Sequence, residues 1–166
     1  FKAYTNVMDL VLGQFIMLEQ IITGKTTFET DAENDLAIAK LILRPKHHKE
    51  FDNENPQDEL KNSNNILNYS VQEVYSVISK FLSNRDYVLF KQFSGVFYEV
   101  PDDDDLSEEQ ADEETSNQMF GQQWYWYSMV RMLAKEDITR YDEIYMLKMS
   151  TVMPEMSYLA QKNKIE

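Results

Sequence analysis

Apolar residues recur at intervals of three and four along the N-terminal part of the chain. One series covers one face of a helix over residues 8–22 and is followed by Gly24, a residue type common at helix C-termini. Thr30 and Glu33 then have the spacing of a capping box, in which the threonine hydroxyl accepts a hydrogen bond from the backbone N–H of the glutamate. We expect a second, short helix that ends at Arg44-Pro45, because proline disfavours helical geometry in the preceding residue.

The middle of the chain predicts two further helices after a long loop. Residues 46–68 are rich in asparagine and show no apolar period, which is typical of a loop. Ser70 and Glu73 form a second capping box and predict a third helix with apolar positions between residues 74 and 82. Residues 83–86 have the composition of a helix break followed by the N-cap of a new helix. A fourth helix over residues 88–97 is therefore expected to pair antiparallel with the third.

An acidic segment separates these helices from the C-terminal part. Residues 99–114 hold ten of the 29 carboxylates, and mutual repulsion is expected to keep the segment extended. A fifth helix over residues 119–134 is expected to bury the side chains of Trp124, Tyr127, Val130, Met132 and Leu133. A sixth, capped by Asp137 or Thr139, continues to Leu159. Its internal Pro154 predicts a kink near residue 151 or a split into two shorter helices.

Together these patterns predict an all-α protein of about six helices in an irregular bundle. The composition agrees, because four glycines and four prolines in 166 residues are too few for the turns of a β-sandwich or barrel. We divide the chain into an N-terminal helical part (1–100), an acidic linker (101–118) and a C-terminal helical hairpin (119–166). We expect these parts to form one domain, since the chain is long enough for a single core.

No residue constellation predicts an enzyme, a cofactor site or a metal site. Cysteine is absent, which excludes disulfides and thiolate ligands. His47 and His48 are adjacent and lack the i, i+4 spacing that directs two imidazoles at one ion. The aspartates at 102–105 lack the glycine and the final glutamate of an EF-hand calcium loop. We therefore expect no catalytic residues, no cofactor and no metal.

The charge and hydropathy patterns restrict the partners. A net charge of −13 argues against direct binding of nucleic acid, because no basic cluster offsets repulsion by phosphates. No apolar run approaches the roughly 20 residues that span a bilayer, and the first residues lack the layout of a signal peptide, so no membrane partner is expected. The same charge leaves one alternative function open, an acidic mimic of DNA or another host-directed inhibitor.

An aromatic run directly follows the acidic segment and contains both tryptophans. Consecutive residues of a helix point about 100° apart, so adjacent aromatic side chains cannot all face one core. Trp124 and Tyr127 are assigned to the core above. The remaining aromatic positions, together with a methionine whose flexible side chain can repack against different partners, predict a partner-binding surface. Its residues are Phe120, Tyr125, Trp126 and Met129.

Two parts of the chain resemble small helical proteins encoded among the structural and tail-assembly genes of tailed bacteriophages, including crAss-like phages. The first part is Leu12-Gly13-Gln14-Phe15-Ile16-Met17-Leu18-Glu19 with Leu41-Ile42-Leu43-Arg44-Pro45, although Met17 stands where an acidic residue is expected. The second part is Ala134-Lys135-Glu136-Asp137-Ile138-Thr139-Arg140-Tyr141-Asp142-Glu143-Ile144 with the ending Leu159-Ala160-Gln161-Lys162. The resemblance covers the two ends and leaves the middle of the chain unassigned.

The resemblance implies a non-enzymatic phage protein that acts through protein contacts. It would be a structural or connector subunit of the virion, or a chaperone of tail assembly. Its implied partners are other phage structural proteins of the portal, the tail or the packaged cargo, and a homo-oligomeric ring is one implied arrangement. The implied location is the virion, or the host cytoplasm during assembly.

Overall fold

The computed structural model describes residues 2–26, 28–44, 51, 58, 66, 69–97 and 125–163. Its principal helices, in chain order, are η1 (Val7–Asp9), α1 (Leu12–Ile22), α2 (Asp31–Ile42), α4 (Val71–Tyr87), the π-helix η3 (Val88–Gln92), α5 (Ser94–Phe97), a helix over residues 125–133, η4 (Ile138–Arg140), α7 (Tyr141–Tyr145) and α8 (Met149–Asn163). The predicted all-α class is confirmed. The acidic linker and almost all of the Asn-rich loop lie outside the described residues.

The N-terminal helices begin and end close to the predicted positions. Gly24 follows α1 with φ +71°, a conformation that glycine adopts without steric penalty. The Thr30–Glu33 capping box is present at the start of α2. The helix ends at Ile42, earlier than predicted, because the next two residues form the strand β2 (Leu43–Arg44). This strand pairs antiparallel with β1 (Lys2–Ala3).

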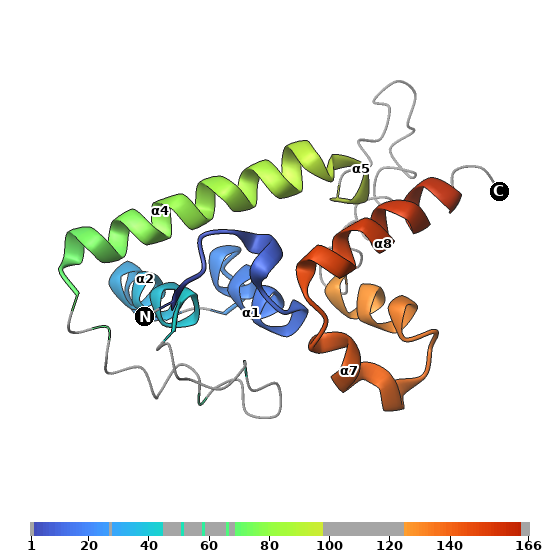
Figure 1. Cartoon of the computed structure of the whole chain (residues 1–166). Coiled ribbons are helices and arrows are strands. Elements are labelled where there is room, and N and C mark those ends of the chain that lie inside the picture. Colours follow the sequence, from blue (N-terminus) through green and yellow to red (C-terminus); the bar gives the residue numbers. More distant parts are fainter. Residues whose placement is uncertain are drawn as a thin grey trace, which may run out of the picture.

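The predicted break at residues 83–86 is wrong. After its Ser70–Glu73 capping box, α4 continues through these residues to Tyr87 and passes directly into η3. Figure 1 shows α4 as one long helix passing over α1 and α2. Asn84 does not cap a new helix, because its Oδ1 accepts a hydrogen bond from the backbone N–H of Val7 at 2.8 Å. The predicted antiparallel pairing of a third and a fourth helix therefore does not occur.

The predicted sixth helix is split in two, which was one of the two expected results. The split falls between α7 and α8, ahead of Pro154, which lies inside α8. At the split the chain forms an antiparallel bridge with the residue preceding α1. The backbone N–H of Leu12 donates to the carbonyl of Leu147, and that of Met149 donates to the carbonyl of Leu10, both at 2.8 Å. These bonds satisfy backbone groups where the helix is interrupted.

One hydrophobic core joins the N-terminal and C-terminal helices. α1 contacts α2, α7 and α8, and α5 contacts α8. The largest fully buried side chains come from both ends of the chain and include Phe15, Leu18, Phe81, Met149 and Met153. The C-terminal helices are therefore held against α1 both by the backbone bridge and by shared apolar packing.

Candidate functional site

The helix over residues 125–133 buries a different face from the one predicted. Met129 and Val130 are 2% and 0% exposed, whereas Tyr127 and Met132, both assigned to the core from the sequence, are 44% and 40% exposed. The assignment of Met129 to the partner-binding surface is wrong, because its side chain is enclosed by the core. Trp124, also assigned to the core, lies outside the described residues.

Tyr125 and Trp126 pack inward, so the prediction that they face a partner is not supported by their contacts. The Trp126 ring meets the buried Phe15 ring edge-on, with 5.1 Å between the ring centroids, and Tyr125 meets Trp126 at the same distance. The Tyr125 hydroxyl donates to the carbonyl of Val96 at 3.1 Å, and burial raises its pKa. Phe120, the fourth predicted residue, lies outside the described residues.

The aromatic side chain that this helix does expose is Tyr127. Its ring lies edge-to-face against that of Tyr141 on α7, with 6.0 Å between the centroids. Arg131 follows Tyr127 by one helical turn, and Tyr145 follows Tyr141 by one turn, so two i, i+4 pairs lie on neighbouring helices. We call these four residues the tyrosine cluster. Tyr141 and Tyr145 are half-buried, while the Arg131 side chain is 54% exposed.

The electrostatics of the tyrosine cluster favour the protonated forms of two of its phenols, those of Tyr141 and Tyr145. Desolvation raises the pKa of Tyr141, the hydrogen bond with Tyr127 raises it further, and the positive charge of Arg131 acts in the opposite direction. Desolvation also raises the pKa of Tyr145, with smaller contributions from Tyr127 and Asp142. Phenols in this state can donate hydrogen bonds.

A tight turn sets the angle between the two helices that carry the cluster. The backbone N–H of Glu136 donates to the carbonyl of Arg131, and that of Lys135 donates to the carbonyl of Met132, which together form a Schellman motif. Lys135 and Glu136 both have positive φ, at 55° and 64°. Such φ values are unfavourable for residues other than glycine, so the hydrogen bonds of the turn must maintain them.

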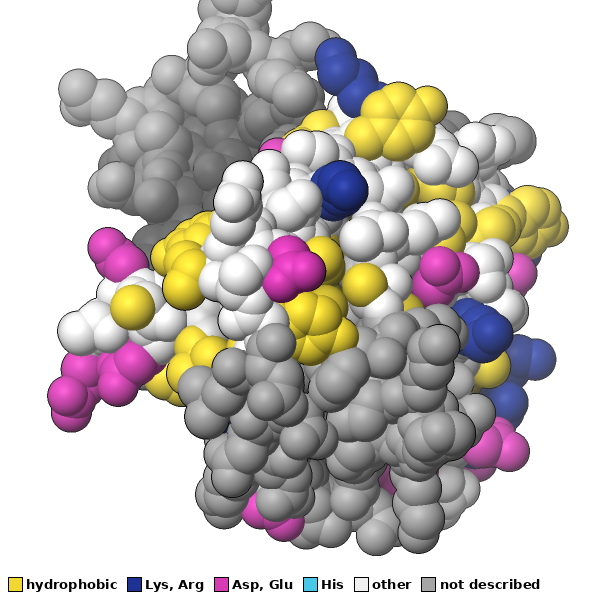
Figure 2. All heavy atoms as spheres, turned by 60° about the vertical axis from the view of Figure 1, so that its left-hand side comes forward, with side chains coloured by type: hydrophobic (Ala, Val, Ile, Leu, Met, Phe, Trp, Pro, Cys, Tyr) yellow, Lys and Arg dark blue, Asp and Glu magenta, His cyan; other side chains and the backbone are white. Residues whose placement is uncertain are grey.

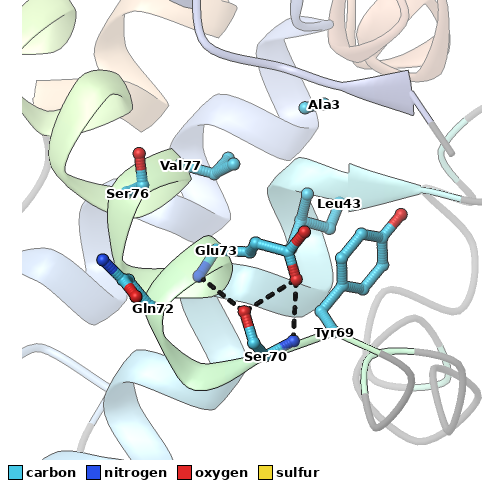
Figure 3. Close-up of a pocket in the computed structure, with 8 residues that line it drawn as sticks. All are labelled: Ala3, Leu43, Tyr69, Ser70, Gln72, Glu73, Ser76 and Val77. Atoms are coloured by element: carbon cyan, nitrogen blue, oxygen red, sulfur yellow. Dashed lines mark hydrogen bonds between the residues drawn. The ribbon is translucent and has the colours of Figure 1, made fainter.

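A pocket of about 470 Å³ lies between the β1–β2 pair and the start of α4 (Figure 3). Two of its polar residues, Ser70 and Glu73, form the capping box at the start of α4. The Ser70 N–H and hydroxyl both donate to Glu73 Oε2, at 2.9 and 2.7 Å, and these bonds lower the pKa of Glu73. The pocket is lined by Ala3, Leu43, Tyr69, Ser70, Gln72, Glu73, Ser76 and Val77. The carboxylate of Glu73 and the hydroxyl of Ser70 are thus committed to capping α4.

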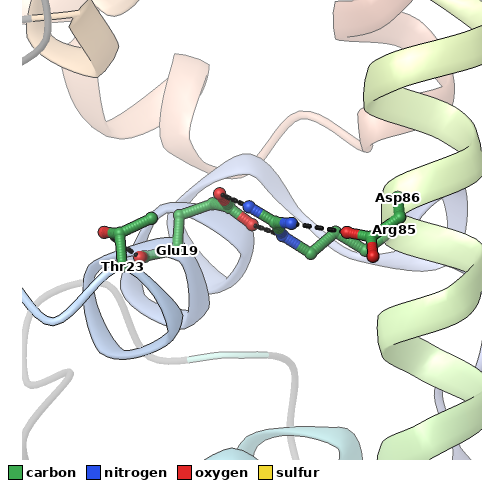
Figure 4. Close-up of polar contacts among 4 residues, drawn as sticks. All are labelled: Glu19, Thr23, Arg85 and Asp86. Atoms are coloured by element: carbon green, nitrogen blue, oxygen red, sulfur yellow. Dashed lines mark hydrogen bonds and ion pairs between the residues drawn. The ribbon is translucent and has the colours of Figure 1, made fainter.

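A buried ion pair joins α1 to α4 (Figure 4). Arg85 donates from Nε to Glu19 Oε1 at 2.5 Å and from Nη2 to Glu19 Oε2 at 2.7 Å, and both residues are almost fully buried. Its Nη1 donates to Asp86 at 2.7 Å. Burial alone would lower the pKa of Arg85, but the hydrogen bonds and charges of Glu19 and Asp86 outweigh burial and raise it. The guanidinium therefore stays charged.

Besides the tyrosine cluster, the described surface exposes large apolar side chains on α4 and α8, among them Val71, Tyr87 and Tyr158. On the face shown in Figure 2, apolar side chains form several separate groups among polar and charged ones. The described residues contain no group of three or more histidine, aspartate and glutamate side chains that could hold a metal ion. In the same part of the chain, no helix has the length and apolar character needed to cross a membrane.

The tyrosine cluster was missed in the sequence because the helical period alone did not define which face of residues 125–133 is buried. Its two halves also lie on either side of a turn whose shape depends on positive φ values. The signal available in the sequence was the i, i+4 spacing of Tyr127 and Arg131, which places both side chains on one face of a helix.

Comparison of the chain with protein-family models, with curated proteins and with solved structures finds no match.

Proposed function

We propose that this chain is a non-enzymatic, protein-binding component of a tailed-bacteriophage particle or of its assembly, and that it binds through the tyrosine cluster. The observation that carries the proposal is the exposed pair of Tyr127 and Arg131 beside Tyr141. Tyrosine and arginine are enriched among the residues that dominate binding energy at protein interfaces. A tyrosine side chain also loses little conformational entropy on binding, because it has only two χ angles.

The positions of the cluster on packed helices support a binding role. Its tyrosines lie on helices that are joined by a hydrogen-bonded turn and are packed against the core, so a partner would meet a surface that is already ordered. A preorganised surface binds more tightly, because fewer groups must be immobilised.

The phage context of the proposal comes from the resemblance of the two ends of the chain. In the fold these ends are neighbours: α1 contains residues 12–19, α7 contains residues 141–144 of the second resembling part, and the two helices are in contact. The resembling segments thus belong to one packed unit, which is consistent with inheritance of a shared helical core. A virion subunit and an assembly chaperone both need a protein-binding surface of this kind.

The test is affinity capture from phage-infected cells with the wild-type chain and with the Tyr127→Ala/Tyr141→Ala double variant. The wild type should retain a phage structural protein that the double variant loses. Tyr87→Ala is the matched control, because Tyr87 is 60% exposed on α4 and lies outside the cluster. Capture of no phage protein by the wild type, or equal capture by the double variant, would contradict the proposal.

Mass spectrometry of purified virions separates the two versions of the proposal. Stoichiometric presence in the particle supports a structural subunit, whereas abundance in infected cells with absence from particles supports a chaperone. If the chain instead inhibits a DNA-binding host enzyme, and the double variant inhibits it equally well, the acidic DNA mimic replaces both versions.

A further inference from the structure

The rings of Tyr127 and Tyr141 form the two walls of an open corner. Their planes are inclined at 74°, with 6.0 Å between the centroids, and Tyr127 is 44% exposed. Tyr145 follows Tyr141 by one turn of α7, so the two side chains lie on the same face of that helix. The face of an aromatic ring carries partial negative charge and attracts cations, and sets of aromatic rings are used to recognise ammonium groups. The corner therefore favours a cation as its ligand.

A carboxylate lies beside this corner. Asp142 is exposed and precedes Tyr145 by three residues on α7, a spacing that makes the two side chains neighbours on the helix surface. Its negative charge acts on the Tyr145 hydroxyl and helps to raise the pKa of that phenol. No lysine or arginine in the described part of the chain lies within ion-pair distance of Asp142. The carboxylate can thus pair with a cation from another molecule.

The neighbouring arginines already have carboxylate partners. Arg131 Nη2 lies 3.3 Å from Glu136 Oε1, and Arg140 Nε lies 3.6 Å from Glu143 Oε2. These two pairs offset the positive charge near the corner and leave the charge of Asp142 uncompensated. The chain as a whole carries a net charge of −13, which attracts a basic partner and repels an acidic one.

We propose that the tyrosine cluster receives a lysine side chain of a partner protein, whose ammonium group lies against the rings of Tyr127 and Tyr141 and pairs with Asp142. This inference rests on the proposed function, because it specifies the chemistry of the partner at the same surface. An ammonium group is compact and has three N–H donors, so it can contact two inclined rings and a carboxylate together. A planar guanidinium would stack on one ring face only.

The experiment is a titration of the isotope-labelled full chain, followed by NMR, with a blocked Gly-Lys-Gly peptide. A single lysine is used because a peptide with many lysines would also bind the acidic segment of residues 99–114. A matched peptide with acetyl-lysine keeps the aliphatic stem and lacks the charge. The lysine peptide should shift the ring signals of Tyr127 and Tyr141, and the acetyl-lysine peptide should not.

Three variants test the separate parts of the site. Asp142→Asn should weaken binding of the lysine peptide about twofold to fivefold, the size expected for an exposed ion pair. Tyr127→Leu should weaken it by a similar factor, because one ring face is lost. Glu136→Gln should also weaken it, because the charge of Arg131 is then no longer offset.

Glu155→Gln is the matched control, because it removes one exposed negative charge on α8, outside the cluster, and should leave the affinity unchanged. Absence of binding by the lysine peptide, equal shifts with the acetyl-lysine peptide, or equal weakening by Asp142→Asn and Glu155→Gln would overturn the inference. Its failure is distinguishable from failure of the proposed function. If Tyr127→Ala/Tyr141→Ala loses a captured phage protein and Asp142→Asn retains it undiminished, the binding surface stands and the lysine partner does not.

Discussion

The buried ion pair between Glu19 and Arg85 gives the sharpest test of how the helices are held together. Its two hydrogen bonds are enclosed at the α1–α4 contact, with Glu19 only 4% and Arg85 only 9% exposed. Removal of one partner leaves the other charge buried and unpaired, which typically destabilises a protein by about 3–5 kcal/mol. Arg85→Met should therefore lower the free energy of unfolding by that amount.

Two companion variants separate pairing from burial. Asp86 is 57% exposed, so Asp86→Asn should cost no more than about 1 kcal/mol even though it also contacts Arg85. The double variant Glu19→Leu/Arg85→Met removes both buried charges and supplies apolar volume in their place. Such replacements are often neutral or stabilising, so this variant should be markedly more stable than Arg85→Met alone.

Urea denaturation followed by far-UV circular dichroism measures these differences directly. For a domain of this size the loss in Arg85→Met corresponds to a fall in Tm of roughly 6–20 °C. A loss below about 1 kcal/mol for Arg85→Met would refute the claim that the pair is buried and coupled. So would a double variant that is no more stable than the single one.

Three further predictions concern the turn, the linker and the helix cap. Lys135→Gly should raise the free energy of unfolding by about 0.5–1 kcal/mol, because glycine adopts the positive φ of this position without steric strain. Lys135→Ala should not raise it, and urea denaturation of both variants checks the difference. Replacement of residues 101–118 by a six-residue Gly/Ser linker should change that free energy by less than about 1 kcal/mol, because Val96 and Tyr125, which lie before and after this segment in the sequence, are hydrogen-bonded to each other and loop length acts only logarithmically. Calorimetry checks this. Hydrogen bonds from Ser70 lower the pKa of Glu73, so its stabilisation is present above the unfolded pKa and is lost as the pH falls through the folded pKa. Glu73→Gln should therefore reduce Tm near neutral pH and flatten its fall between about pH 7 and pH 3.

Features that depend on a few neighbouring residues were predictable from the sequence. The capping boxes that begin α2 and α4 require only a hydroxyl and a glutamate three residues apart, and both formed. The glycine after α1 adopts the positive φ that favours it there. The all-α class followed in the same way, since it depends on apolar period and on the scarcity of turn residues.

Features that depend on distant contacts were decided only by the tertiary structure. Residues 83–86 have the composition of a helix break. α4 nevertheless continues through them, because Arg85 forms a buried ion pair with Glu19 on α1, 66 positions earlier in the chain. The face of the helix over residues 125–133 is set by packing of Trp126 on Phe15, which exposes Tyr127. Helical periodicity identifies the faces of a helix, but the face that is buried depends on which element packs against it, and that information is not local.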